Sequence, residues 1–503
     1  MILTGLLFLP LLFIFPLFLL KKETHLKILG FSLSVLHLVY GAFVAFKFDK
    51  GNLSHQMVEL ANLFKPLGIH YSLGVDGLSL LLCALSLILM PLIILGTWKS
   101  MGPNVKPYLI GLFSLQICML GTFLSLDLIL FYLFFEASLI PMLLLMGIYG
   151  GKERIFAAKK FFIFTFSGSI LLLGSIITMM ILFESVNGYP SSLMADLQLI
   201  QLPFVKNTIF STQTVLFFGF FLAFAVKAPL FPLHTWLPDA HVEAPTGGSV
   251  ILAGLMLKMG TYGMIRFLGM YFPQASGEYS WAICILAIMG IIYGAMVAFA
   301  QTDMKKLVAY SSVSHMGYIV LGIFCWNEIA HQGASFQMIS HGLSTGALFL
   351  MIGMLYERFK TREMSAYGGL AKVMPNFTIF FFIITFSSIA VPLTNGFIGE
   401  FLILTGAFAA NKYYGIFAAA GIFLGASYML NMVKKVFFGP VTEKFKNLKD
   451  IDLSIREMAV LSPIVIMIFL TGIYPSLITD VLEKPGDEIS REYVEGEGQY
   501  ATK

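Results

Sequence analysis

The sequence predicts an all-α protein that crosses a lipid bilayer about fourteen times, and three observations support this prediction. First, 58% of the 503 residues are hydrophobic and only 12% are charged, whereas soluble domains carry about 25% charged residues. Second, apolar runs of spanning length follow one another with few interruptions. Third, these runs do not alternate polar with apolar residues, so helices are the form that satisfies their backbone inside lipid.

The expected spans follow the apolar runs in chain order. They cover residues 2–20, 28–46, 77–98, 108–126, 128–149, 160–183, 213–240, 246–270, 279–301, 306–326, 331–356, 375–410, 413–438 and 456–477. In the first run the positive charges follow the apolar residues and no small-residue cleavage site appears, so we expect a retained helix and not a signal peptide. We also expect a short surface helix over 191–202 and a loosely ordered or docked tail after Ile478.

The basic residues predict the orientation of the chain. Roughly two thirds of the 32 Lys and Arg residues lie in loops that follow odd-numbered spans. Because basic loops stay in the cytoplasm, both termini are expected on the opposite, periplasmic side. The net charge of +4 is small and scattered over many loops, which excludes an extended nucleic-acid-binding surface.

Two spans contain helix-breaking residues beside a charge. Pro229 and Pro232 follow Lys227 in the seventh span, and Pro392 precedes Glu400 in the twelfth. A proline interrupts a helix, which a membrane protein tolerates where protein or a water-lined cavity surrounds the break. The breaks lie five spans apart, which favours two five-helix halves of inverted topology. Ordinary proline kinks are the alternative.

This spacing divides the chain into four segments. Residues 1–107 would form the first three helices, and 108–270 the first five-helix repeat. Residues 279–438 would form the second, inverted repeat, and 439–503 the last transmembrane helix with a polar tail.

Four ionisable residues lie inside apolar spans: Glu136, Lys227, Lys258 and Glu400. A charge at the centre of a span costs roughly 2.5–3.5 kcal/mol on insertion scales. Four of them therefore cost on the order of 10 kcal/mol, comparable with the stability of a whole domain. Such residues must pair or line a hydrated path, and we predict that they carry protons across the bilayer. Structural ion pairs are the alternative.

His315 and His341 add groups that titrate near neutral pH to the tenth and eleventh spans. They lie between the two breaks in chain order, and it stays open whether they transfer protons or are hydrogen-bonded core residues. His234 and His241 flank the end of the seventh span. Their spacing matches no metal motif, so no metal site is predicted.

No cofactor is expected in this chain. The cysteines stand far apart in apolar runs, without metal or redox spacing, and are predicted to be buried hydrophobic residues: Cys83, Cys118, Cys284 and Cys325. Motifs for nucleotide binding and for nucleophilic catalysis are missing from the sequence. Energy must therefore come from an ion gradient or from partner subunits.

Four stretches form long and specific strings. They are VKAPLFPLHTWLPDAHVEAPTGGSVILAGLMLKMGTYGMIRF (226–267), AFAQTDMKKLVAYSSVSHMGY (298–318), SHGLSTGALFLMIGMLYER (340–358) and NGFIGEFLIL (395–404). These strings resemble the proton-translocating antiporter-like subunits of respiratory complex I (NADH:quinone oxidoreductase), over the third to the thirteenth span. The string LFFEASLIPM and the acid in the twelfth span are similar to the chain M type, equivalent to mitochondrial subunit 4.

The resemblance implies a proton path through each inverted half, joined at mid-membrane. Six residues match the family's path by motif. Glu136 and Lys227 would form the interacting pair of the first half, Lys258 the central carrier, His315 and His341 the bridge, and Glu400 the terminal carrier toward the outside.

The resemblance also implies where the chain works. It would be a multi-pass subunit of a bacterial inner membrane, beside sister antiporter-like subunits, while NADH, FMN, iron–sulfur clusters and quinone act in partner subunits. A subunit of a cation/proton antiporter or of a membrane-bound hydrogenase from the same superfamily is the alternative. An inert scaffold and a solute transporter are further alternatives, although no span is polar enough to recognise a solute.

Overall fold

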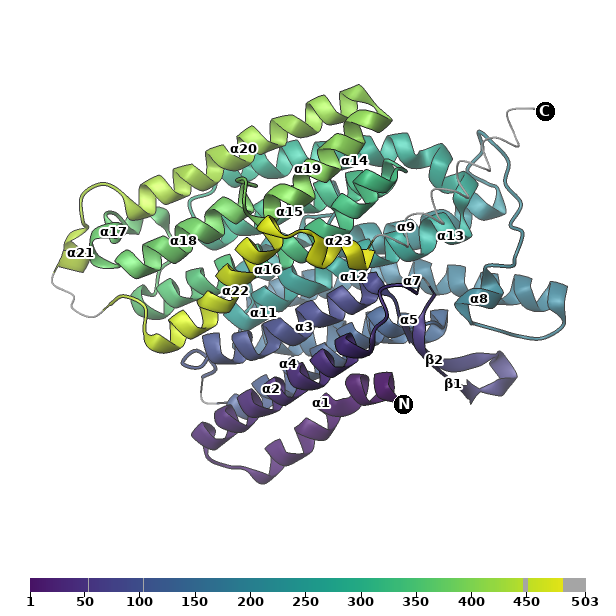
Figure 1. Cartoon of the computed structure of the whole chain (residues 1–503), viewed down its shortest axis with the longest axis horizontal. Helices are drawn as coiled ribbons and strands as arrows, with labels where there is room; N and C mark the ends of the chain where they lie inside the picture. Colours follow the sequence, from purple (N-terminus) through teal and green to yellow (C-terminus); the bar gives the residue numbers. More distant parts are fainter. Residues whose placement is uncertain (53, 103, 447–450, 483–503) are drawn as a thin grey trace.

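The structure is a computed structural model that describes residues 1–52, 54–102, 104–446 and 451–482. Long apolar helices run side by side through the molecule (Figure 1). Within the described ranges, twelve helical segments are long and apolar enough to cross a membrane. The predicted polytopic helical fold is confirmed, whereas the number of fourteen spans and the inverted repeats stay predictions. The expected tail lies mostly outside the described residues.

The part of the chain before residue 272 contains the N-terminal helices and a hairpin. Its elements are α1 (Ile2–Leu19), α2 (Glu23–Lys47), β1 (Gln56–Phe64), a 3-10 turn (Lys65–Leu67), β2 (Ile69–Val75), α3 (Gly77–Gly96), α4 (Val105–Leu124), α5 (Leu128–Ala137), α6 (Leu139–Tyr149), α7 (Arg154–Asn187), α8 (Met194–Leu197), α9 (Thr212–Lys227), α10 (Trp236–Glu243), α11 (Thr246–Ile251), a π-helical segment (Leu252–Met256), α12 (Leu257–Gly263), a second π-helical segment (Met264–Leu268) and α13 (Gly269–Tyr271).

The rest of the chain is helical wherever it forms regular structure within the described ranges. Its elements are α14 (Pro273–Phe299), α15 (Met304–Phe324), α16 (Glu328–Phe359), a 3-10 turn (Met364–Ala366), α17 (Leu370–Val373), α18 (Pro375–Ser388), α19 (Asn395–Ala410), α20 (Lys412–Phe437), α21 (Glu443–Lys446), α22 (Ile455–Ile473) and α23 (Ser476–Leu482).

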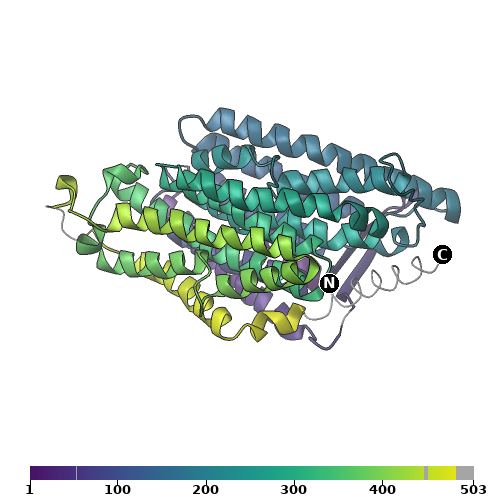
Figure 2. The same ribbon diagram turned by 90° about the horizontal axis from the view of Figure 1, so that it is seen from above.

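The helices at the centre of the bundle are enclosed by the others. In Figure 1, α1 and α2 lie at one edge and α20 at the opposite edge. Seen from above, α7 and α22 lie on opposite sides (Figure 2). The continuous helix from α11 to α13 and the helix α16 are buried along their whole apolar windows. Polar residues on these central helices therefore have protein, not lipid, as their surroundings.

The chain breaks its helices at both positions that the prolines predict. α9 ends at Lys227 and α10 begins at Trp236, while α18 ends at Ser388 and α19 begins at Asn395. Side chains satisfy backbone groups near the first break, where the Trp236 indole N–H donates to the Val226 carbonyl at 3.0 Å. Such partners are what makes a broken helix tolerable away from water.

A β-hairpin between α2 and α3 departs from the all-α prediction. β1 and β2 pair antiparallel and project beyond the bundle (Figure 1). The turn needs glycine at Gly68, whose φ is +62° and where a Cβ would collide with the Pro190 carbonyl. Val58 and Leu60 of β1 are exposed.

The segment 191–202 is not the surface helix that its pattern predicts, since only the four residues of α8 are helical. Its start is held in extended form instead. The Ser192 N–H donates to the Gly68 carbonyl at 2.9 Å, and the Ser192 hydroxyl donates to the Asp127 carboxylate at 2.5 Å. These bonds to the hairpin and to the start of α5 outweigh the local helical pattern.

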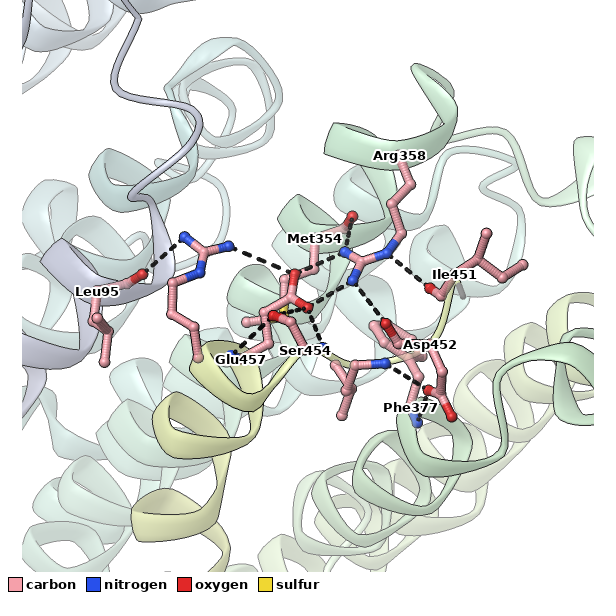
Figure 3. A network of polar contacts seen from close by, with 10 residues as sticks. Leu95, Met354, Arg358, Phe377, Ile451, Asp452, Ser454 and Glu457 are labelled. Carbon is pink, nitrogen blue, oxygen red and sulfur yellow. Dashed lines mark hydrogen bonds and ion pairs between the residues drawn. The ribbon is translucent and has the colours of Figure 1, made fainter. Parts of the chain in front are cut away.

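A polar network ties α22 to the rest of the bundle (Figure 3). Arg358, near the end of α16, donates to both carboxylate oxygens of Glu457 at 2.7 and 2.6 Å, and also to the carbonyls of Ile451 and Asp452. The Asp452 carboxylate accepts from the backbone N–H of Phe377 at 2.9 Å, at the start of α18. Arg358 and Asp452 together therefore join α16, α18 and α22 at this end of the bundle.

We expect Arg358→Met to lower the free energy of unfolding by about 1.5–3 kcal/mol, because it removes the two-pronged hydrogen bond to a buried carboxylate. The carboxylate would keep its hydrogen bonds from Ser454. Glu457 is 2% exposed, so water cannot replace the lost guanidinium. Arg456→Met is the matched control, since Arg456 faces the same carboxylate at 3.7 Å and should cost less. Thermal unfolding of the purified variants measures both losses. Equal losses of stability in the two variants would show that Arg358 stabilises this network no more than Arg456 does.

Candidate functional site

Lys258 lies in α12, between two π-helical segments of one continuous helix, Leu252–Met256 and Met264–Leu268. Its side chain is 0% exposed. Ala253, five residues earlier, is one π-helical turn away, and its carbonyl accepts a hydrogen bond from the Lys258 ammonium. π-helical turns are often found at functional sites. Here the wide turn brings a backbone acceptor to a buried cation.

The second contact of Lys258 is His341 of α16. Lys258 Nζ lies 2.6 Å from His341 Nδ1. The His341 ring in turn meets the ring of His315, from α15, with centroids 5.5 Å apart and planes at 61°. The Nε2 atoms of both histidines are buried and have no hydrogen-bond partner among the described residues. The two rings therefore link the lysine to a third helix.

Glu400 closes this row of residues. It lies early in α19, just after the second helix break, and is buried. Its Oε1 atom is 2.9 Å from His315 Nδ1 and accepts a hydrogen bond from Gln337 Nε2 at 3.1 Å. Lys258, His341, His315 and Glu400 thus form one continuous row across four helices.

Lys227, the last residue of α9, lies in a separate polar cluster with residues of α5 and the junction of α5 and α6. Its ammonium donates to the Ser138 hydroxyl at 3.1 Å and to the Phe135 carbonyl at 3.4 Å, and it lies 4.5 Å from the centroid of the Phe135 ring. α5 ends beside these groups, which leaves the carbonyl available. Lys227 is therefore held by the junction of α5 and α6.

Glu136 does not form a direct ion pair with Lys227. Its carboxylate lies beside the Ser169 hydroxyl of α7. The two charges still interact electrostatically across the gap. The two residues that the resemblance pairs are thus near each other but not in contact, because the Lys227 ammonium donates its hydrogen bonds to Ser138 and Phe135 instead.

His234 and His241, which flank the first helix break, pack against aromatic rings. His241 stacks on Phe349 with ring centroids 4.5 Å apart, and His234 stacks on Phe231 at 5.7 Å. Within the described ranges, no cluster of three His, Cys, Asp or Glu side chains could hold a metal ion. All four cysteines are buried and free, in agreement with the sequence-based prediction.

An ion pair between Asp76 and Arg266 was not predicted from the sequence. Arg266 lies at the end of the Lys258 helix, and its guanidinium is 2.5 Å from the carboxylate of Asp76. Asp76 also caps α3 by accepting from the Ser79 N–H at 2.9 Å. Burial would raise the pKa of Asp76, but the Arg266 guanidinium, His55 and the Ser79 amide outweigh it and lower the pKa to about 2. The sequence does contain one signal for this ion pair, because Arg266 is a basic residue within an apolar run.

Gln337 is the second residue that the sequence patterns missed. It lies four residues before His341, so both side chains share one face of α16. That spacing was the signal, but a neutral amide carries no insertion cost comparable with that of a charge.

Comparison with known proteins places this chain in a family. Residues 125–425 match the family model described as NADH:quinone oxidoreductase/Mrp antiporter, TM. The chain is 44% identical to the NADH-quinone oxidoreductase subunit M of Rhodobacter capsulatus, over 92% of this chain and 89% of that one. It is 40% identical to the NADH-ubiquinone oxidoreductase chain 4 of Arabidopsis thaliana, over 91% and 90% of the two chains.

A solved structure agrees with these relatives. A chain of the respiratory complex I from Thermus thermophilus with bound NADH is 31% identical, with a TM-score of 0.86, over 98% of this chain and 99% of that one. The match therefore includes the N-terminal helices and the hairpin that lie outside the family model. The chain belongs to the family of NADH:quinone oxidoreductase and Mrp antiporter transmembrane subunits, and it is of the subunit M (chain 4) type.

Proposed function

We propose that this chain is a proton-pumping membrane subunit of NADH:quinone oxidoreductase. The observation that carries the proposal is the continuous row from Lys258 through His341 and His315 to Glu400. Groups that exchange protons at neutral pH must lie within hydrogen-bond reach of one another, and two of the three consecutive pairs do so. These pairs are Lys258 with His341 and His315 with Glu400, while the two histidine rings lie with centroids 5.5 Å apart. The relatives of the chain carry the name of that enzyme.

The imidazole rings suit a relay because each can take a proton on one nitrogen and release it from the other. His341 would take a proton from Lys258 Nζ on Nδ1 and release one from Nε2. His315 would take it on Nε2 and release one from Nδ1 to Glu400 Oε1. Both Nε2 atoms lack other partners within the described part of the chain, which leaves them free for this exchange.

The Lys227 cluster would drive the relay. If Lys227 leaves the neighbourhood of Glu136 and approaches Lys258, repulsion between the ammonium groups favours release of the Lys258 proton. α9 and α12 pack backbone to backbone at Gly260, where a Cβ would collide with Phe224 and Ala228. The two lysines therefore lie on helices in direct contact.

The repulsion between two lysine ammonium groups is similar in size to the cost of moving one proton across the membrane. Moving one charge against a potential of about 200 mV costs roughly 4–5 kcal/mol. Two like charges about 4 Å apart interact by about 4 kcal/mol at an effective dielectric constant of 20. One rearrangement of the charge pair could thus drive about one proton.

The site of action follows from the same proposal. Bacterial relatives favour the inner membrane, and the basic loops favour periplasmic termini. NADH, FMN, iron–sulfur clusters and quinone would act in partner subunits, and sister antiporter-like subunits would flank this chain. Glu136, Lys227 and Lys258 would then belong to the first of two inverted halves, 108–270. His315, His341 and Glu400 would belong to the second, 279–438.

Glu400→Gln tests the proposal directly. In proteoliposomes that contain the assembled enzyme, the variant is expected to lose at least about 90% of NADH-driven proton translocation, since the amide cannot take up the proton that His315 releases. Glu184→Gln, on the exposed end of α7, is the control and should pump normally. Normal translocation by Glu400→Gln would overturn the proposed relay.

A cation/proton antiporter subunit is the second candidate, because the matching family includes Mrp antiporters. The two functions differ in their driving force. Proton movement that starts on addition of NADH, in a complex that co-purifies with flavin and iron–sulfur subunits, supports the oxidoreductase. Proton movement that needs only a sodium gradient supports the antiporter.

A further inference from the structure

Gln337 is the only polar residue besides His315 that donates to Glu400 within the described ranges. We propose that Gln337 is a positioning residue, which holds the Oε1 atom of Glu400 against His315 and stabilises the ionised carboxylate that accepts the relayed proton. This inference rests on the proposed function and extends it to a neutral residue that the relay itself does not include.

The hydrogen-bond geometry gives Gln337 this role. Gln337 Nε2 and His315 Nδ1 both approach the same oxygen, at 3.1 and 2.9 Å, from α16 and α15 respectively. An amide N–H cannot itself release a proton at neutral pH, so it can only orient the carboxylate and stabilise its charge. With one oxygen engaged by two donors, the carboxylate has little freedom to rotate away from His315.

The packing of α16 against α19 fixes the amide in place. A Cβ at Gly399 would collide with both the side chain and the backbone of Gln337. The same two helices meet at Gly333, where a Cβ would collide with the backbone of Ile403, and at Gly406, where it would collide with Ala330. Three glycines therefore let the two backbones touch, and Gln337 lies within this rigid contact.

The charged surroundings of Glu400 are otherwise sparse. Its charge interacts with Tyr318 of α15 and Tyr428 of α20. His341 of α16 contacts the ring of His315 and not the carboxylate itself. α18 has no titratable residue in its sequence. Those of α22, Arg456 and Glu457, lie in its first turn, where Glu457 pairs with Arg358 and Arg456. Tyr318 donates its hydroxyl elsewhere, to the Ala418 carbonyl at 2.7 Å. Removing the Gln337 amide would leave His315 as the single N–H donor to the carboxylate among the described residues.

The test compares the pH dependence of NADH-driven proton translocation in the assembled enzyme, from about pH 5.5 to 9, where relay groups titrate. Gln337→Met keeps an unbranched side chain of similar size and removes the amide. We expect the acid limb of its profile to move to higher pH by about one unit, the size expected when one hydrogen bond to a charged group is lost. Gln337→Glu keeps the shape of the side chain and should move the limb further, since two adjacent carboxyls resist ionising together.

The matched control is Gln116→Met. Gln116 of α4 is also a fully buried glutamine, and its side chain lies beside His37 of α2. The same substitution there removes a buried amide without touching Glu400, so the acid limb should stay in place. The infrared C=O band of the protonated Glu400 carboxyl, assigned by its loss in Glu400→Gln, follows the same titration without turnover.

The outcomes separate this inference from the function on which it rests. A Gln337→Met enzyme whose rate falls equally at every pH, or whose acid limb and infrared titration do not move, overturns the positioning role. Normal pumping by Glu400→Gln overturns the proposed relay itself. If Glu400→Gln loses pumping and the acid limb of the pH profile moves in both Gln337 variants, the relay and the positioning role of Gln337 are both supported.

Discussion

Replacing Lys258 by Met is expected to slow NADH-driven proton translocation about 100-fold, the lower end of the range for loss of a proton-transferring group. Methionine has an unbranched side chain and fits a buried site, but it has no proton to give to His341. The fold should survive, because replacing a buried charge by an apolar side chain is often neutral or stabilising. Dye-monitored acidification of proteoliposomes, together with NADH oxidation, measures the effect.

Lys258→Arg separates charge from proton release. A guanidinium stays protonated at every physiological pH, so it keeps the positive charge next to His341 but cannot pass the proton on. We therefore expect it to pump as poorly as the methionine variant. Lys412→Met, at the exposed start of α20, is the control for loss of a lysine. Wild-type proton stoichiometry in Lys258→Arg would show that Lys258 is only a structural cation.

Asp76→Asn is expected to lower the free energy of unfolding by about 3–5 kcal/mol, because it leaves the Arg266 guanidinium buried without its carboxylate. The asparagine oxygen can still cap α3 at Ser79, so the loss reports on the ion pair and not on the cap. Thermal unfolding of the solubilised protein at pH 7 measures the difference. Asp480→Asn, on the exposed side of α23, is the control and should change little.

The pH dependence gives an independent check on Asp76. Its pKa is lowered in the folded protein from 3.8 to about 2. Its contribution is therefore complete above about pH 4 and is lost as the pH falls through about 2. The stability difference between wild type and Asp76→Asn should shrink over that window. A difference that stays constant down to pH 2 would contradict the ion pair.

Much of the fold followed from physical constraints that act locally along the sequence. Length and hydropathy decide a span because lipid favours apolar helix, and Pro229 and Pro392 lie near charged residues at the two positions where the helices break. Buried charges are equally easy to recognise in the sequence, since a charged residue inside an apolar run costs energy that only a partner or a hydrated path can offset. The polytopic helical fold, both helix breaks and the burial of these charges were therefore predictable.

Features that depend on distant partners were not predictable in this way. The hairpin of β1 and β2 needs Gly68 packed against Pro190, and the extended form of residues 191–202 needs Asp127. The bond of Lys227 to Ser138 instead of Glu136 depends on how two helices meet. Gln337 was hidden because its importance lies in a contact with Glu400, not in its own chemistry.

The two π-helical segments around Lys258 have a consequence for the angular phase of that helix. Each wide turn adds a residue without adding a turn, so side chains beyond it are rotated by about 100° relative to an uninterrupted α-helix. Residues of α11, α12 and α13 therefore follow three different angular registers, and no single helical wheel describes them. Lys258 therefore points toward His341 because the π-helical turn Leu252–Met256 contains one extra residue, which rotates the side chains that follow it.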